Sequence, residues 1–186
     1  MTEIPKLPDP VAVTVDPGAA ALLVLDLSDT FVPQSPAISA TIPAVKKLIE
    51  RARAAGVRVV FSLGRAAEQK VFPDLDPKAD DPVVRSSADK FFNTDLAERL
   101  QGIQQAVVVG TAANGAVVYT SFGCCARGIT VVVAEDGISA RDPFSTWVAR
   151  YQLLDQPGFP NKQNEPLKAK AVTLSRTDLI TFGKGI

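Results

Sequence analysis

Short hydrophobic runs alternate along the chain with segments in which apolar residues recur every three or four positions. The short runs predict strands at 21–27, 57–63, 106–109, 129–134 and 170–174. The first run is interrupted only by Asp26, which is typical of a parallel strand buried on both faces. Strands separated by helices imply right-handed crossovers. We therefore expect an α/β fold, a three-layer αβα sandwich with a mainly parallel central sheet, formed by a single domain over residues 1–186.

The clearest helical pattern follows Thr41 and continues to Ala55. It carries one apolar stripe, made of Ile42, Val45, Leu48, Ile49 and Ala52. Thr41 is the expected N-cap residue, Pro43 fits the first turn, and Gly56 ends the pattern. Further helices are predicted at 96–100 and 144–154.

Two polar segments, 65–88 and 156–167, interrupt the alternation and contain several prolines. We expect both to be surface loops, and the first can cover the carboxyl edge of the sheet. Neither is long enough or biased enough in composition to be a linker between domains.

Composition excludes several classes of partner. The 20 basic and 20 acidic side chains balance, so there is no electrostatic reason to expect nucleic acid or an anionic membrane. The longest apolar run, 19–25, is too short to span a bilayer, and residues 1–17 lack the features of a signal peptide. We therefore expect a cytoplasmic protein.

Histidine is absent from the chain, which excludes catalytic triads that contain histidine and metal sites that need it. The two cysteines, Cys124 and Cys125, are adjacent, so they cannot form a tetrahedral metal site and are expected to be reduced thiols. We expect no metal and no cofactor. Acid–base chemistry would then rely on Asp, Glu, Lys or Tyr.

The segment 107–116 predicts a strand, a tight turn and the start of a helix, an arrangement that directs backbone N–H groups toward a ligand. Ala116 occupies the place of a nucleophile in such a turn. The alternative is a β-hairpin at Asn114-Gly115 with a returning strand at 117–120. The small residues at 121–126 and the Gly128 that follows favour the helix.

Asp26 ends the first predicted strand, where open α/β sheets bind ligands. Its carboxylate could act as a general base or anchor a ligand. Alternatively, it could cap the next turn through backbone hydrogen bonds. Asp29 is better placed for that turn, which favours a functional role for Asp26.

The sequence resembles the isochorismatase-like cysteine hydrolases from Ala20 to Phe182. The resemblance rests on three segments: 21–26 together with Phe31, the stretch 90–96, and the turn and helix at 110–128. It implies an Asp, a Lys and a Cys acting together, the thiolate attacking an amide-type carbon.

Of these three residues only Asp26 matches, because Arg85 falls at the lysine position and Ala116 at the cysteine position. Ala116 lies in a Gly-Thr-Ala-Ala-Asn-Gly-Ala turn that resembles a subgroup lacking the nucleophile. Arginine keeps the positive charge but does not share a proton as lysine does. Lys90 is an alternative cation. Cys124 lies eight residues after Ala116, roughly 12 Å along a helix, too far to replace the missing thiol.

The expected binding residues are Asn114, Gly115, Phe31, Lys90, Phe91 and Tyr119, although aromatic residues at such places are also typical of a core. Two functions remain open. One is a hydrolase or lyase that acts on a small carbonyl compound, with Asp26 activating water and the amides of Gly115 and Ala116 stabilising an oxyanion. The other is a binding or regulatory protein that retains a pocket for a small anion. We also expect a homo-oligomer.

Overall fold

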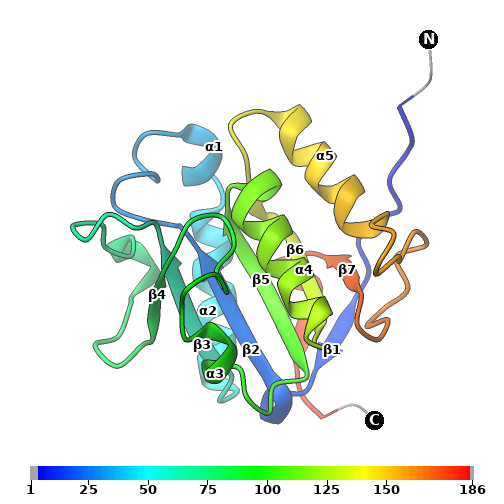
Figure 1. Cartoon of the computed structure of the whole chain (residues 1–186), viewed down its shortest axis with the longest axis horizontal. Helices are drawn as coiled ribbons and strands as arrows, with labels where there is room; N and C mark the ends of the chain where they lie inside the picture. The colour runs from blue at the N-terminus through cyan, green and yellow to red at the C-terminus, as the bar shows by residue number, and fades with distance from the viewer. Residues whose placement is uncertain (1–3, 185–186) are drawn as a thin grey trace.

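The computed structural model describes residues 4–184. Its centre is a six-stranded sheet in the order β4-β3-β2-β5-β6-β7 (Figure 1). The strands are β2 (Ala20–Leu25), β3 (Arg58–Leu63), β4 (Val83–Arg85), β5 (Gln105–Thr111), β6 (Thr130–Ser139) and β7 (Val172–Ser175). The short strands β1 (Val13–Val15) and β8 (Ile180–Phe182) form a separate pair. All neighbouring strands are parallel, which confirms the expected sheet.

Helices cover both faces of this sheet. They are α1 (Pro36–Ser39), α2 (Ile42–Ala54), α3 (Leu96–Arg99), α4 (Val118–Ala126) and α5 (Pro143–Leu154). The buried side chains form two cores, one under α2 and one under α3, α4 and α5. In Figure 1, α4 and α5 lie in front of the sheet and α2 behind it. The three-layer sandwich is therefore confirmed.

Helix α2 forms where its apolar stripe predicts it. All five residues of the stripe are buried, and Gly56 has a φ of 78°, the left-handed conformation that glycine adopts most readily at a helix end. The expected cap differs. Thr41 precedes the helix, but its side chain makes no capping bond, because its hydroxyl donates to the carbonyl of Ile38 at 2.8 Å.

The carboxyl edge of the sheet differs most from the prediction. The predicted loop 65–88 contains β4, and β6 continues to Ser139 through polar residues that had indicated a strand end at 134. The Asn114-Gly115 pair lies in a π-helical turn, η3 (Ala113–Val117), that leads directly into α4. The hairpin alternative is therefore wrong, and the strand–turn–helix interpretation is confirmed.

Within residues 4–184, no helix combines the length and the apolar character needed to cross a membrane.

Candidate active site

The candidate site lies at the carboxyl ends of β2 and β5. Gly110 of β5 pairs with Leu25, the last residue of β2. A Cβ atom on Gly110 would lie 2.0 Å from the Leu25 carbonyl oxygen, and the φ of Gly110 is +126°. Only glycine can occupy this position without displacing the backbone. The close approach places the turn after β5 beside Asp26.

Asp26 directly follows β2 and has a φ of 54°, a conformation that few residues other than glycine adopt. Its N–H donates to the carbonyl of Ser62 at 3.0 Å. The residue is therefore held by β3 as well as β2. A non-glycine residue in the left-handed region is often found where function requires it.

The Asp26 carboxylate forms a buried ion pair with Lys90. The distance from Lys90 Nζ to Asp26 Oδ1 is 2.8 Å, and only 1% of the lysine side chain is exposed. Lys90 Nζ also donates to the carbonyl oxygens of Ser86 and Leu63, at 3.3 and 3.4 Å. The ammonium is thus surrounded by oxygen acceptors, so its buried charge is compensated.

Burial and the ion pair shift the pKa of the Asp26 carboxyl in opposite directions. Removal from water raises the pKa of the carboxyl, the Lys90 ammonium lowers it, and burial has the larger effect, so the pKa lies above its ordinary value of 3.8. The Ser62 hydroxyl lies 3.5 Å from the same oxygen that Lys90 contacts. Among residues 4–184, no donor forms a hydrogen bond or ion pair with the other oxygen, Oδ2. That oxygen is free to exchange a proton with a ligand or water.

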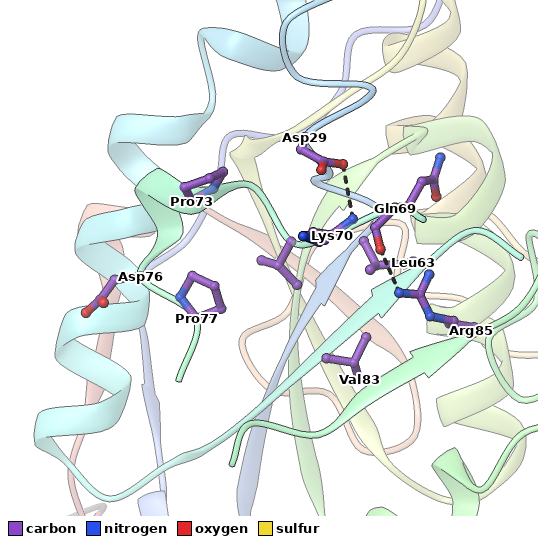
Figure 2. A pocket seen from close by; sticks show the side chains of 10 residues that line it. Asp29, Leu63, Gln69, Lys70, Pro73, Asp76, Pro77, Val83 and Arg85 are labelled. Carbon is purple, nitrogen blue, oxygen red and sulfur yellow. Dashed lines mark hydrogen bonds between the residues drawn. The ribbon is translucent and has the colours of Figure 1, made fainter. Parts of the chain in front are cut away.

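Arg85 lies elsewhere, which corrects the expectation that it takes the lysine position. Its guanidinium donates to the carbonyl oxygens of Ala66 and Gln69, at 2.8 and 2.6 Å. Figure 2 shows it directed toward the backbone at Gln69, while the Lys70 N–H donates to Asp29. These residues line a separate cavity of about 540 Å³, whose lining includes neither Asp26 nor Ala116. Arg85 therefore holds a loop, and Lys90 is the cation at Asp26.

A larger cavity, of about 680 Å³, opens at Asp26 and Ala116. Its size is typical of a small-molecule site. The lining residues are Asp26, Phe31, Gln34, Ser35, Pro36, Ile38, Ala88, Thr111, Ala112, Gly115, Ala116, Ala140 and Arg141. The charged residues among them are Asp26 and Arg141, and the remainder are neutral.

The turn after β5 presents a helix N-terminus to this cavity. Ala112, Gly115 and Ala116 line it, at the start of the helical segment formed by η3 and α4. The positive end of the helix dipole therefore borders the cavity. The Gly115 N–H, however, donates to the Ala112 carbonyl at 2.9 Å. It is occupied within the turn, contrary to the expectation that it is available to an oxyanion.

Only some of the predicted binding residues meet at the cavity. Phe31 and Gly115 line it, whereas Lys90 lies behind Asp26 and is not part of the lining. Asn114 is exposed outside the lining, and Tyr119 is 57% exposed on α4.

Phe91 is buried in the core instead. A Cβ on Gly123 of α4 would lie 2.6 Å from its ring, and the Arg127 guanidinium lies 3.9 Å from the ring centre. The Phe91 ring therefore packs against α4 and is not part of the cavity lining.

Both thiols are buried within α4 and are absent from the cavity lining. Burial raises the pKa of Cys124 strongly and that of Cys125 to about 12. A buried thiol of such high pKa is a poor nucleophile. Neither cysteine can stand in for a thiol at position 116.

Sequence reasoning missed Ser62 and Arg141. Ser62 is a polar residue in β3, whose other residues after Arg58 are apolar, and Leu25 is its partner in the sheet. Arg141 follows β6 at the carboxyl edge, where ligands bind in open sheets. Both signals are present in the sequence, but the polar residues within β6 hid the end of that strand.

Among residues 4–184, no group of three or more His, Cys, Asp or Glu side chains is placed to hold a metal ion.

Residues 20–159, more than half of the chain, match the family profile described as the isochorismatase domain. The chain belongs to the isochorismatase family. One relative, the "Secreted isochorismatase effector Isc1" of Verticillium dahliae, is 32% identical over 120 residues, which are 56% of this chain. The match covers 63% of that protein, so this chain spans less than two thirds of its relative's length.

Solved structures of the isochorismatase family share the fold. An isochorismatase family protein from Burkholderia thailandensis has a TM-score of 0.74 at 21% identity, covering 91% of this chain and 96% of its own. N-carbamoylsarcosine amidase from Thermoplasma acidophilum has a TM-score of 0.70 at 23% identity, covering 86% and 96%. An isochorismatase from Pseudomonas putida has a TM-score of 0.75 at 16% identity, covering 90% and 92%. The protein is thus an isochorismatase-family, hydrolase-like protein.

Proposed function

We propose that this protein is a hydrolase that cleaves a small carbonyl compound bearing an anionic group, without forming a covalent bond to a thiol. The observation that carries the proposal is the asymmetry of the Asp26 carboxylate. Lys90 holds Oδ1 from behind, while Oδ2 has no partner among residues 4–184 and Asp26 lines a cavity of about 680 Å³. A fixed carboxylate with one free oxygen and a raised pKa is suited to proton transfer.

In the proposed reaction Asp26 is the general base. Its Oδ2 takes a proton from water as the water oxygen bonds to the carbonyl carbon. The bond from that carbon to the leaving group then breaks, and its electron pair goes to the leaving group. The leaving group takes the proton back from Asp26, so the products are an acid and a protonated leaving group.

The helix N-terminus at Ala116 supports the same chemistry. The carbonyl oxygen gains negative charge as water adds, and the positive end of the η3–α4 segment borders the cavity there. Ala116 has no side chain that reacts, and it lines the same cavity as Asp26. Lys90 is a positioning residue in this mechanism, because it touches the carboxylate and is not part of the cavity lining.

The proposal is tested by incubating the protein with small carboxylates that also carry an amide or a ureido group, beginning with N-carbamoylsarcosine. Proton NMR follows consumption of each compound. We expect at least one to be consumed, and Asp26→Asn to lower its rate by roughly 10²-fold or more, as expected for loss of a general base. A rate that survives this substitution would contradict the role of Asp26.

Binding without reaction is the second candidate function, and the absence of a nucleophilic side chain at Ala116 favours it. In that case a compound of the panel would raise the melting temperature of the wild-type protein. It would do so without being consumed. Such a result would identify a binding protein that has kept the cavity of its family.

A further inference from the structure

We propose that the outer surface of helices α4 and α5 binds a second copy of this chain in a symmetric dimer. The two helices contact each other and lie together in front of the sheet (Figure 1). Tyr119 of α4 and Phe144 and Tyr151 of α5 are 57%, 63% and 36% exposed, and Trp147 between the last two is half-buried. We call these four side chains the aromatic face. None of them lines the cavity at Asp26, so the inference does not depend on the proposed function.

The helices that carry the aromatic face lack the charges of an ordinary exposed surface. Helix α4 contains no charged residue, and the one charged residue of α5, Arg150, forms an ion pair with Glu135 of β6. Helix α2, on the opposite side of the sheet, exposes Lys46, Lys47 and Glu50 to water. A helix that is apolar on both sides is typical of one that is buried on both sides. We therefore infer that a further surface covers α4 and α5.

Three members of the aromatic face form a continuous row along α5. The Phe144 and Trp147 rings are stacked with their centres 6.3 Å apart, and the Trp147 and Tyr151 rings with their centres 5.5 Å apart. The Tyr151 hydroxyl also donates to Asp155 Oδ2 at 2.7 Å. The rings therefore hold one another in place before a partner binds, which lowers the entropy that binding costs.

The order of the row makes it complementary to itself. Phe144 lies three residues before Trp147, and Tyr151 lies four residues after it. When two α5 helices pack antiparallel about a two-fold axis at Trp147, Phe144 of each copy meets Tyr151 of the other. This reciprocal pairing is that of a symmetric dimer interface. The two tryptophans lie at its centre, where the residues that contribute most to binding are concentrated.

Charge also favours a second copy as the partner. An uncharged surface complements another copy of itself, whereas a nucleic acid or an anionic membrane needs basic residues. The single basic residue of the two helices, Arg150, is already paired with Glu135. The chain has 20 basic and 20 acidic side chains, so two copies carry no net charge that would keep them apart at neutral pH.

The test measures the mass of the whole chain by sedimentation equilibrium at roughly 1 to 100 µM, the range of a dissociation constant near micromolar. The variants are Phe144→Glu and Tyr151→Lys, each alone and then mixed in equal amounts. Phe92→Glu is the matched control, because Phe92 is 53% exposed and lies outside α4 and α5. It introduces the same charge at a phenylalanine away from the aromatic face. Circular dichroism verifies that each variant is folded.

We expect the wild type to approach twice the mass of one copy. Phe144→Glu and Tyr151→Lys each weaken dimerisation roughly 10-fold or more, because a charge replaces an aromatic contact that excludes water. Phe92→Glu leaves dimerisation unchanged. Mixing the two variants restores part of the affinity, because antiparallel packing brings the introduced negative charge of one copy beside the introduced positive charge of the other.

Three results would overturn the inference. The first is a wild type that keeps the mass of one copy over the whole range, which would leave the aromatic face to a different partner. The second is a dimer that Phe144→Glu does not weaken, which would place the interface elsewhere. The third is a mixture that associates no better than either variant alone, which would contradict the antiparallel pairing of Phe144 with Tyr151.

Discussion

The Lys90 ammonium lies 2.8 Å from Oδ1 of Asp26, and the two side chains are 1% and 13% exposed. Two opposite charges at this distance and depth act as one unit. Neither can be removed without leaving the other unpaired in a region of low polarity. The pair therefore links the stability of the fold to the chemistry of the cavity.

Lys90→Met is expected to lower the free energy of unfolding by about 3–5 kcal/mol at neutral pH, because it leaves a buried carboxylate without a partner. The loss should shrink at acidic pH, where Asp26 takes up a proton. Urea unfolding at both pH values measures it. Lys47→Met, at an exposed lysine of α2, is the control and should change the free energy by less than about 0.5 kcal/mol. Equal losses for the two variants would contradict the buried pair.

The titration of Asp26 should follow from its burial. The pKa is raised above 3.8 in the folded protein, so the folded state binds the proton more tightly than the unfolded state does. The contribution of Asp26 to stability is therefore full below pH 3.8 and is lost as the pH rises through the folded pKa. Carbon-13 NMR of the Asp carboxyls, assigned with Asp26→Asn, measures this pKa. The pKa should rise further in Lys90→Met, because the ammonium that lowers it is gone. A fall would contradict the conclusion that Lys90 lowers the pKa of Asp26.

Gly110→Ala is expected to lower the free energy of unfolding by about 3 kcal/mol, because the new Cβ would overlap the carbonyl of Leu25. Gly56→Ala is the matched control. Gly56 also has a positive φ, but a Cβ added there would meet nothing within 4 Å. Gly56→Ala should lower the free energy of unfolding by only about 1 kcal/mol. Thermal or urea unfolding of both variants separates the effect of the close contact from the effect of the positive φ. Similar losses in the two variants would contradict a cost from the contact with Leu25.

Ala116→Cys should create a reactive thiol. A cysteine at this helix N-terminus faces the cavity, and the dipole lowers its pKa. Iodoacetamide should modify it much faster than Cys124 or Cys125, whose burial raises their pKa values. Peptide mass spectrometry over time gives the three rates. A thiol at position 116 that reacts no faster than the native two would indicate a closed cavity.

Regular, deeply buried elements could be predicted from the sequence. The stripe on α2 is buried as its spacing indicates, because a helix that packs on a sheet needs one continuous apolar face. Strands β1, β4 and β8 could not be predicted, since three residues are too few to show a pattern. Strand β6 was cut short in the prediction because Glu135 and Asp136 interrupt its apolar run.

The site was predictable only where it coincides with a strand end. Asp26 and Ala116 follow adjacent parallel strands, so their meeting follows from topology. The identity of the cation that pairs with Asp26 does not follow from topology. Arg85 and Lys90 are five residues apart in a segment predicted as a loop, and the path of the chain there decides which of them turns inward. Arg85 ends the edge strand β4 and binds loop carbonyls, while Lys90, five residues later, reaches the carboxylate.

In the proposed reaction Asp26 acts without any thiol. Cys124 and Cys125 are the two cysteines of the chain, so the double variant Cys124→Ala/Cys125→Ala has none. The decisive measurement is its rate of hydrolysis, on a compound that the wild type consumes, relative to wild type and to Asp26→Asn. We expect a rate within about twofold of wild type for the thiol-free variant and a loss of roughly 10²-fold or more for Asp26→Asn. A folded thiol-free variant without activity, or an active Asp26→Asn, would contradict it.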